Sequence, residues 1–338
     1  MPLFLGADIG GTRSRVWLAT ERGDVVSRAE GQGANYQAAG TEVARSRMAA
    51  VVEAALTQSR AVASDIVAAA FGVAGADRIN DYAVVRALLP PLPHAKVTLV
   101  NDGVVALRAG TCDGVGVAMV AGTGTNTVGR DGRGREERIG GFGSELGDSG
   151  SATDLGRAAL GLAVRGRDGR GRPTALSDKL CAALDLRVLE DIVDLWIDHD
   201  PRGTNYGRLA PCVFAAAQEG DGVARDLLTA AGEEFALCVH LVLDRLFSRE
   251  EPVTVVLGGS VLQQGEDSTL VRALCASLSR THPRARVVRL RVEPVVGGVL
   301  LAHDQVENDG NAFAHGLEAS VGTAPFFESI DLPIGGEL

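Results

Sequence analysis

Short apolar runs alternate with longer amphipathic segments through the first third of the chain. The short runs have the length of strands, and the longer segments carry apolar residues at the spacing that a helix requires. The predicted strands are residues 3–9, 14–20, 24–29, 68–73 and 96–100, and the predicted helices are residues 41–60 and 80–89 with a short one ending at Ala109. The order is therefore β-β-β-α-β-α-β-α.

A similar pattern restarts at Gly114. The predicted strands are residues 115–120, 125–130, 136–139, 253–257 and 286–290; helices dominate up to residue 247, with breaks at 165–172 and 200–204, and a last helix lies near 296–305. Alternating strands and helices predict largely parallel sheets with helices outside. Residues 306–338 are polar and lack periodicity, so we predict a loosely ordered tail there.

Glycine-rich turns follow apolar runs at corresponding points of the two halves. Gly10-Gly11-Thr12 is echoed by Gly122-Thr123-Gly124, and Gly72-Val73-Ala74-Gly75 is echoed by Gly258-Gly259-Ser260. Glycine lets backbone amides approach a phosphate closely, and successive amides form a concave anion site. A single turn of this kind is often only a hairpin, but the ordered set favours a nucleotide held between two similar lobes. The chain has neither GxxxxGK[ST] nor GxGxxG, which disfavours a P-loop or a Rossmann site.

Net charge and the placement of the cysteines disfavour a nucleic-acid-binding protein and a cysteine-based metal site. The formal charge of −10 gives no global positive field, so we expect no nucleic-acid partner. The five cysteines are scattered without metal-binding spacing, as is usual for free thiols in a reducing compartment. No apolar run reaches the length of about 18 residues needed to span a bilayer. We therefore expect a soluble cytoplasmic enzyme with no membrane partner.

Several motifs together resemble one known family. They are Gly6-Ala7-Asp8-Ile9-Gly10-Gly11-Thr12-Arg13-Ser14, Gly33-Ala34-Asn35, Val100-Asn101-Asp102, Ala121-Gly122-Thr123-Gly124-Thr125-Asn126, Gly140-Gly141-Phe142-Gly143 through Gly147-Asp148-Ser149-Gly150-Ser151, and Leu257-Gly258-Gly259-Ser260. In this order and spacing they resemble the BadF/BadG/BcrA/BcrD-type ATPase family, which belongs to the sugar kinase/heat-shock/actin superfamily and contains N-acetylglucosamine kinase. The resemblance implies an α/β, two-lobed ribonuclease H-like fold of the actin/hexokinase type, with a duplicated βββαβαβα core and an interlobe cleft.

The resemblance also implies a nucleotide side and a sugar side. On the nucleotide side, Asp8 would lie near Mg²⁺, directly or through water, and the ATP-binding turns would comprise Gly10, Gly11, Thr12, Thr123, Gly124, Asn126, Gly258 and Gly259. On the sugar side, Asp102 would be the general base, and the pocket would be lined by Asn35, Asp102, Gly141, Phe142, Gly143 and Asp148. The family often has Trp at the position of Phe142 and Glu at that of Ser149, so these departures bear on the identity of the sugar.

General chemistry agrees with this division, because phosphoryl transfer needs positioning, charge neutralisation and one acceptor that orients the attacking hydroxyl. Structural interpretations stay open for each acid. Asp102 and Asp148 each precede a predicted helix and could be N-caps. Asn35 could adopt a left-handed turn conformation. The arginine-rich stretch 165–172 could touch phosphate, although a solvated loop is the commoner use of such a sequence.

We predict an ATP-dependent kinase acting on the 6-hydroxyl of an amino sugar, with N-acetylglucosamine the first choice and glucosamine or N-acetylmuramate as close alternatives. The other branch of the family, an ATPase that activates a dehydratase through an iron–sulfur cluster, needs paired cysteines, and no cysteine lies between Cys112 and Cys181. We expect a homodimer, an N-terminal ATPase lobe at 1–111, and a C-terminal ATPase lobe with helical insertions at 112–295. The helix at 296–305 would pack back on the first lobe.

Overall fold

The computed structural model describes residues 1–192, 205–263, 269–306, 310–323 and 325–330. The predicted break at 200–204 and parts of the predicted tail lie outside these residues. The chain divides into two compact units. The first comprises residues 1–118, 128–136 and 288–330, and the second comprises residues 119–127, 137–287 and 331–338.

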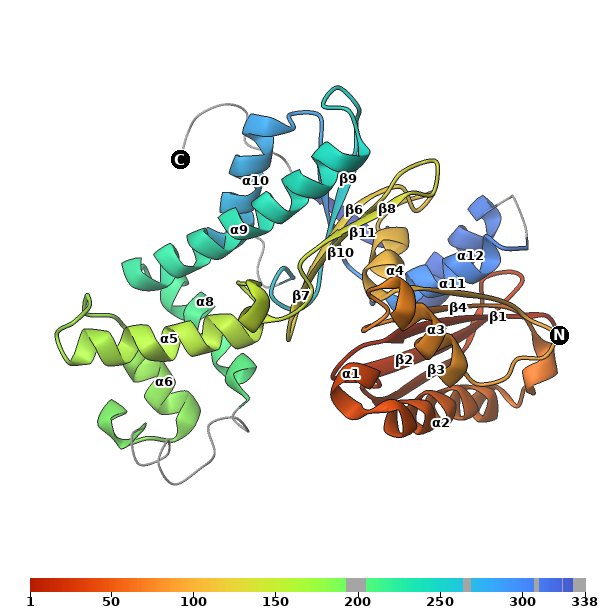
Figure 1. Ribbon diagram of the computed structural model, residues 1–338, viewed down its shortest axis with the longest axis horizontal. Coiled ribbons are helices and arrows are strands. Elements are labelled where there is room, and N and C mark those ends of the chain that lie inside the picture. Colours follow the sequence, from red (N-terminus) through yellow and green to blue (C-terminus); the bar gives the residue numbers. More distant parts are fainter. Residues whose placement is uncertain (193–204, 264–268, 307–309, 324, 331–338) are drawn as a thin grey trace. The chain divides into compact units, whose positions relative to one another are not determined.

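The first unit contains a five-stranded sheet in the order β3-β2-β1-β4-β5 (Figure 1). Its strands are β1 (Leu3–Ile9), β2 (Arg13–Thr20), β3 (Val25–Gln32), β4 (Ile66–Val73) and β5 (Lys96–Asn101). β1 pairs with β2 and β2 with β3 in antiparallel fashion, whereas β1–β4 and β4–β5 are parallel. The prediction of a largely parallel sheet is therefore wrong for the first three strands. Their short connections can only form hairpins, while helical crossovers return β4 and β5 in parallel.

Side chains of β1 alternate between two faces of this sheet. Leu5, Ala7 and Ile9 belong to the core that includes Met48 and Val51 of α2 (Thr41–Ser59). The residues between them, including Asp8, therefore face the other way. Helices α4 (Asp102–Ala109) and α11 (Val295–His303) pack against that other face (Figure 1).

Glycines permit this close packing of α4 and α11. A Cβ on Gly6 would lie 2.2 Å from the backbone nitrogen of Val299, and one on Gly72 would lie 2.7 Å from the side chain of Val105. A Cβ on Gly297 would lie 1.8 Å from the Val105 carbonyl oxygen. Helix α11 therefore lies directly on β1 and on α4.

The second sheet has six strands in the order β11-β10-β9-β6-β7-β8. Its strands are β6 (Gly116–Ala121), β7 (Thr125–Arg130), β8 (Glu136–Ile139), β9 (Thr254–Gly258), β10 (Arg286–Leu290) and β11 (Phe327–Ile330). The remaining α-helices are α1 (Tyr36–Ala39), α3 (Ile79–Leu88), α5 (Ala152–Arg167), α6 (Leu176–Leu184), α8 (Ala210–Gln218), α9 (Gly222–Leu246), α10 (Thr269–Thr281) and α12 (Gly310–Val321). Short 3₁₀ segments occupy Ala63–Asp65, Ser144–Leu146, Leu189–Asp191 and Tyr206–Leu209.

Most predicted elements up to residue 303 are found within a few residues of their expected limits, but the prediction for 306–338 is wrong where the structure describes it. Helix α12 and strand β11 lie in this region. Phe313 and Leu317 of α12 are buried, and the ring of Phe313 stacks on His303 with centroids 3.9 Å apart. A Cβ on Gly316 would lie 1.8 Å from the Arg22 carbonyl oxygen, so the helix lies against the β2–β3 hairpin. Two apolar anchors are too few to give a visible helical periodicity.

Among the described residues, no helix combines the length and the hydropathy that crossing a membrane requires.

Candidate functional site

Asp8 is the acid at the centre of the first unit's candidate site. It stands directly opposite Arg15 in the β1–β2 pair, with a guanidinium nitrogen 4.0 Å from its carboxylate, and its side chain is only 16% exposed. Burial, and after it the nearby charge of Asp102, raise the pKa of Asp8 to about 7 against the opposing effect of Arg15. A buried carboxylate with incomplete charge compensation is a place where a cation binds favourably.

Glu293 is a member of this cluster that the sequence did not reveal. Its carboxylate forms an ion pair with Arg15 at 2.9 Å, and its charge also acts to raise the pKa of Asp8. Arg15 is thus shared among Asp8, Glu30 and Glu293. The only sequence signal was an acid two residues before the glycine-containing helix α11.

The turn Gly10-Gly11-Thr12 joins β1 to β2. The Gly10 amide donates to the Arg13 carbonyl, and the Thr12 carbonyl accepts from the Gly33 amide. A Cβ on Gly10 would lie 2.9 Å from the Arg13 oxygen, whereas one on Gly11 would meet nothing within 4 Å. Gly10 is therefore required by the turn itself, and Gly11 has open space in front of it.

Asp102 is the first residue of α4, but it is not the residue that caps this helix. Asn101 is the N-cap, and its side-chain oxygen accepts from the Gly103 amide at 3.0 Å. The capping interpretation of Asp102 is therefore wrong. Asp102 is half-buried, and its carboxylate lies at the positive end of the helix dipole. Its negative charge acts on Asp8 and raises the pKa of that residue.

Asn35 caps α1 in an extended conformation, with φ −65°. The left-handed interpretation is therefore wrong. Its side-chain oxygen accepts from the Gln37 amide at 2.9 Å and lies where a Cβ on Gly75 would come within 2.6 Å. Gly75, with φ +90°, belongs to the turn that follows β4, and this turn lies against the side chains of Asn35 and Asn101.

The second unit contains the other predicted nucleotide turns. Gly122-Thr123-Gly124 is closed by the Gly122 amide donating to the Gly124 carbonyl, and it is held at the start of α5. The Ala152 amide donates to the Gly122 carbonyl at 2.8 Å, and the Thr153 hydroxyl donates to the Thr123 carbonyl at 2.9 Å. As with Gly11, a Cβ on Gly124 would meet nothing within 4 Å.

The turn after β9 lies directly against this one. Gly259 has φ +86°, and a Cβ there would lie 2.3 Å from the Ala121 carbonyl oxygen, which accepts from the Val261 amide. The predicted nucleotide residues Thr123, Gly124, Gly258 and Gly259 therefore share one end of the β6–β9 pair. Asn126 departs from this group, because its side-chain oxygen lies where a Cβ on Gly141 would come within 3.2 Å.

The loop 140–148 is built around Asp148. Its Oδ2 accepts from the backbone amides of Phe142 at 2.7 Å and Gly143 at 2.6 Å. Ser151 caps α5 in a reciprocal pair with Asp154, so the capping interpretation of Asp148 is wrong. Phe142 is 52% exposed, and the Arg138 guanidinium lies 4.5 Å from its ring centroid.

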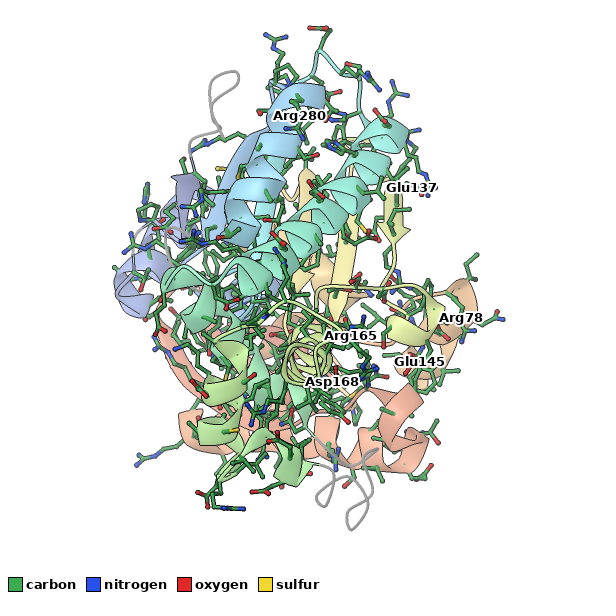
Figure 2. All side chains as sticks on the ribbon, turned by 90° about the vertical axis from the view of Figure 1, so that its left-hand side faces the viewer. Arg78, Glu137, Glu145, Arg165, Asp168 and Arg280 are labelled. Carbon is green, nitrogen blue, oxygen red and sulfur yellow. The ribbon has the colours of Figure 1, made fainter. Side chains whose placement is uncertain are left out.

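The arginine-rich stretch 165–172 is largely engaged within the chain. Arg167 pairs with Glu190 at 2.7 Å, Arg170 pairs with Asp168, and Arg172 pairs with Asp226. Figure 2 shows Arg165 and Asp168 at the end of α5 that faces the viewer. These ion pairs support the interpretation of a solvated surface.

The donor set near Asp8 suits Mg²⁺ better than a metal that needs a protein cage. Among the described residues no group of three or more His, Cys, Asp or Glu side chains is arranged to hold a metal ion. Mg²⁺ is usually held by one or two carboxylates together with water and substrate phosphates. Asp8 beside the open Gly11 turn fits that pattern.

Comparison with known proteins agrees with this geometry. The chain is 27% identical over 315 residues to an N-acetyl-D-glucosamine kinase of Dictyostelium discoideum, covering 89% of this chain and 97% of that protein. It is 25% identical over 308 residues to an N-acetylmuramic acid/N-acetylglucosamine kinase of Clostridium acetobutylicum, covering 91% and 100%.

A solved structure from Chromobacterium violaceum, provisionally assigned as an N-acetylglucosamine kinase, superposes with a TM-score of 0.68 at 25% identity, covering 89% of this chain and 99% of that one. This similarity confirms the predicted α/β fold of the actin-like ATPase type. The family model described as the BadF/BadG/BcrA/BcrD ATPase family matches residues 5–302. The chain is therefore a member of the BadF/BadG/BcrA/BcrD ATPase family.

Proposed function

We propose that this protein is an ATP-dependent kinase that transfers a phosphoryl group to the 6-hydroxyl of an amino sugar, with N-acetylglucosamine as the preferred acceptor. Family membership and the named activities of the two relatives support the reaction class. The single observation that carries the assignment of the base is that Asn101, not Asp102, caps α4. Asp102 is therefore the first residue of α4 and not its cap, and its charge acts on the neighbouring Asp8.

In this proposal Asp102 accepts a hydrogen bond from the attacking hydroxyl and takes its proton as the bond to phosphorus forms. A carboxylate within hydrogen-bond reach of the attacking hydroxyl is a suitable acceptor for its proton. The side chain of Asn35 lies against Gly75, in the turn after β4. Its amide group is suited to a second sugar hydroxyl.

ATP would be held by the open glycine turns, with backbone amides on the phosphates. Asp8 would hold Mg²⁺, which neutralises phosphate charge when bound. The turns at Gly122–Gly124 and Gly258–Gly259 share one strand end, which is consistent with a single nucleotide lying along both.

The acceptor is proposed from the loop 140–148. Phe142 offers an exposed apolar face for a sugar ring, and Asp148 fixes the loop through two backbone amides. Glucosamine and N-acetylmuramate remain the alternatives, because a pocket that binds shared ring hydroxyls accepts them unless the N- or O-substituent is rejected.

The decisive experiment measures ATP consumption with glucosamine, N-acetylglucosamine, N-acetylmannosamine, N-acetylmuramate and glucose. Two-dimensional phosphorus–proton NMR of the product then identifies the phosphorylated oxygen. We expect the highest kcat/KM with N-acetylglucosamine and phosphate on C6. An Asp102→Asn preparation purified in parallel controls for contaminating kinases. No sugar-dependent ATP consumption with any acceptor would overturn the proposal.

A further inference from the structure

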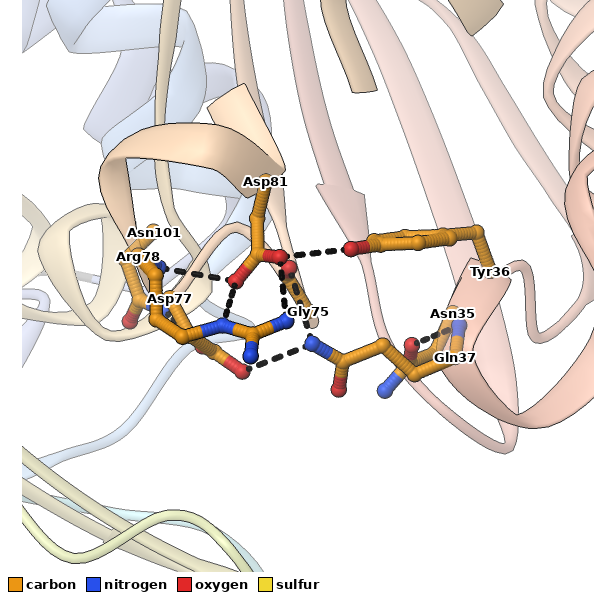
Figure 3. A network of polar contacts seen from close by, with 8 residues as sticks. All are labelled: Asn35, Tyr36, Gln37, Gly75, Asp77, Arg78, Asp81 and Asn101. Atoms are coloured by element: carbon orange, nitrogen blue, oxygen red, sulfur yellow. Dashed lines mark hydrogen bonds and ion pairs between the residues drawn. The ribbon is translucent and has the colours of Figure 1, made fainter. Parts of the chain in front are cut away.

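The turn at residues 74–78, between β4 and α3, lies between Asn35 and the start of α4 and is fixed on both sides by polar contacts. Figure 3 shows this network. On one side, the Tyr36 hydroxyl donates to Asp81 at 2.6 Å. The side-chain nitrogen of Gln37 donates to the Gly75 carbonyl at 3.3 Å and, more weakly, to Asp77 at 3.4 Å. Helix α1, which Asn35 caps, is thus tied to the turn.

On the other side, Asn101 ties the same turn to α4. Its side-chain nitrogen donates to Asp77 Oδ1 at 3.1 Å and to the Ala76 carbonyl at 3.3 Å. Its side-chain oxygen accepts from the Gly103 amide. Asn101 is only 3% exposed, so water cannot readily replace these partners.

The two ends of the Asn101 amide are chemically different, which gives Asp77 a specific role. A carboxylate can only accept, so Asp77 requires the nitrogen of Asn101 to point toward it. The oxygen must then point toward the Gly103 amide, where it caps α4. The charge on Asp77 makes this the stronger of the nitrogen's contacts.

We infer that Asp77 is a positioning residue that sets the orientation of the Asn101 amide and, through it, the place of Asp102 relative to Asn35. The inference rests on the proposed role of Asp102 as the base. Asp77 is not required to touch sugar, ATP or Mg²⁺. A small misplacement of a catalytic group can cost about 100-fold in rate, so a residue acting only through Asn101 can have a large effect on kcat.

Four variants test the contact. Asp77→Ala removes the acceptor, and Asn101→Asp keeps an N-cap of equal quality but places two carboxylates in contact. Asp77→Asn keeps an acceptor and should be mild. The swapped variant Asp77→Asn/Asn101→Asp restores a donor and an acceptor across the same pair. Glu53→Gln, on the exposed side of α2, is the control for loss of one acidic charge.

We expect Asp77→Ala and Asn101→Asp to lower kcat by about 10- to 100-fold with the KM for ATP nearly unchanged. The swapped variant should recover most of the kcat that Asn101→Asp loses, and Glu53→Gln should have the kcat of the wild type. Thermal unfolding of every variant separates a loss of kcat from a loss of folded protein. A purely structural role would lower stability without a selective fall in kcat. A double-mutant cycle of wild type, Asp77→Asn, Asn101→Asp and the swapped variant measures the coupling between the two residues directly.

Each result decides between the two proposals. Near wild-type kcat in folded Asp77→Ala and Asn101→Asp, together with an inactive Asp102→Asn, overturns the inference and leaves the proposed base intact. A swap as slow as Asn101→Asp also overturns the inference, because the loss then comes from something other than the contact between residues 77 and 101. An active Asp102→Asn overturns the proposed role of Asp102 itself.

Discussion

The Oδ2 atom of Asp148 accepts a hydrogen bond from the backbone amide of Gly143 at 2.6 Å. The same oxygen accepts from the Phe142 amide, so one carboxylate oxygen holds two successive peptide groups of the loop. Glycines in the left-handed region make this possible, since Gly141 and Gly143 have φ of +84° and +98°. The loop that would carry the sugar-facing aromatic ring therefore depends on an acid six residues further along the chain.

Asp148→Ala should raise the KM for the sugar by about tenfold or more, which corresponds to about 1.4 kcal/mol, with the KM for ATP little changed. Asp148→Asn retains an oxygen that can accept both amides, so it should be much milder if the residue acts by holding the loop. Steady-state kinetics of both variants, with sugar and ATP each varied, distinguish a role in holding the loop from a direct contact with the sugar. If Asn is as damaging as Ala in folded protein, the charge of Asp148 acts on the substrate directly. A shift of the ATP constant alone would place Asp148 on the nucleotide side.

Asp102→Asn should keep the shape of the site and remove the proton acceptor. General-base loss typically costs about 10²–10⁴ in rate, so we expect kcat to fall by that order. Nucleotide affinity, measured by calorimetry, should be nearly unchanged. A variant that keeps more than about a third of the wild-type kcat, far above the range for base removal, would contradict the assignment.

Gly11→Val and Gly124→Val should weaken MgATP binding without unfolding the protein. A side chain at either position enters open space, so folding is not obstructed, but the branched chain would keep phosphate away from the backbone amides. Gly132→Val, also facing open space, is the matched control in the β7–β8 turn. Calorimetric titration with ATP and Mg²⁺ measures the effect. Unchanged affinity in both folded variants would make these turns structural only.

Asp81→Asn should destabilise the protein at neutral pH and much less in acid. Arg78 donates to the Asp81 carboxylate, and with the Tyr36 hydroxyl it holds the pKa of Asp81 well below its usual range. Stability from a lowered carboxylate pKa is fully present above the unfolded value of about 3.9 and is lost as pH falls below it. Hydrogen bonds to charged groups contribute about 1.5–3 kcal/mol, so we expect a loss of that order at neutral pH.

Urea unfolding of wild type and Asp81→Asn at about pH 7 and about pH 3, either side of the unfolded pKa, measures this difference. The gap between the two proteins should narrow at the lower pH. Glu53→Gln again serves as the control for charge alone. A gap of the same size at both pH values would show that the ionisation of Asp81 is not what stabilises the fold.

The sequence predicted the main strands and the positions of Asp8 and Asp102 because those features are local. Apolar alternation marks a strand, and an acid at its end is visible without a fold. The prediction missed the mixed direction of the first sheet, although the short connections on either side of β2 allow only hairpins.

Other parts of the site depend on residues that are distant in the chain. An acid such as Glu293 has no distinguishing pattern, and only the packing of α11 on β1 brings it to Arg15. Asp148 holds its loop through backbone amides, and the left-handed conformation of the loop glycines decides which amides point toward its carboxylate. Among the residues of α12 whose burial the structure describes, Phe313 and Leu317 are the buried apolar ones, which is too few for a periodicity to show in the sequence.

The packing of α11 on β1 has a consequence for the order of synthesis. One face of the hairpin strands β1 to β3 can be covered by α2 once the chain up to Ser59 has emerged, because that helix ends there. The opposite face, where Phe4 and Gly6 lie, lacks the cover of α11 until residues 295–303 have left the ribosome. Nascent chains with exposed apolar surface are prone to aggregate. The N-terminal sheet thus lacks one of its packing partners for most of translation. Truncation before α11 would remove the helix that packs directly on β1.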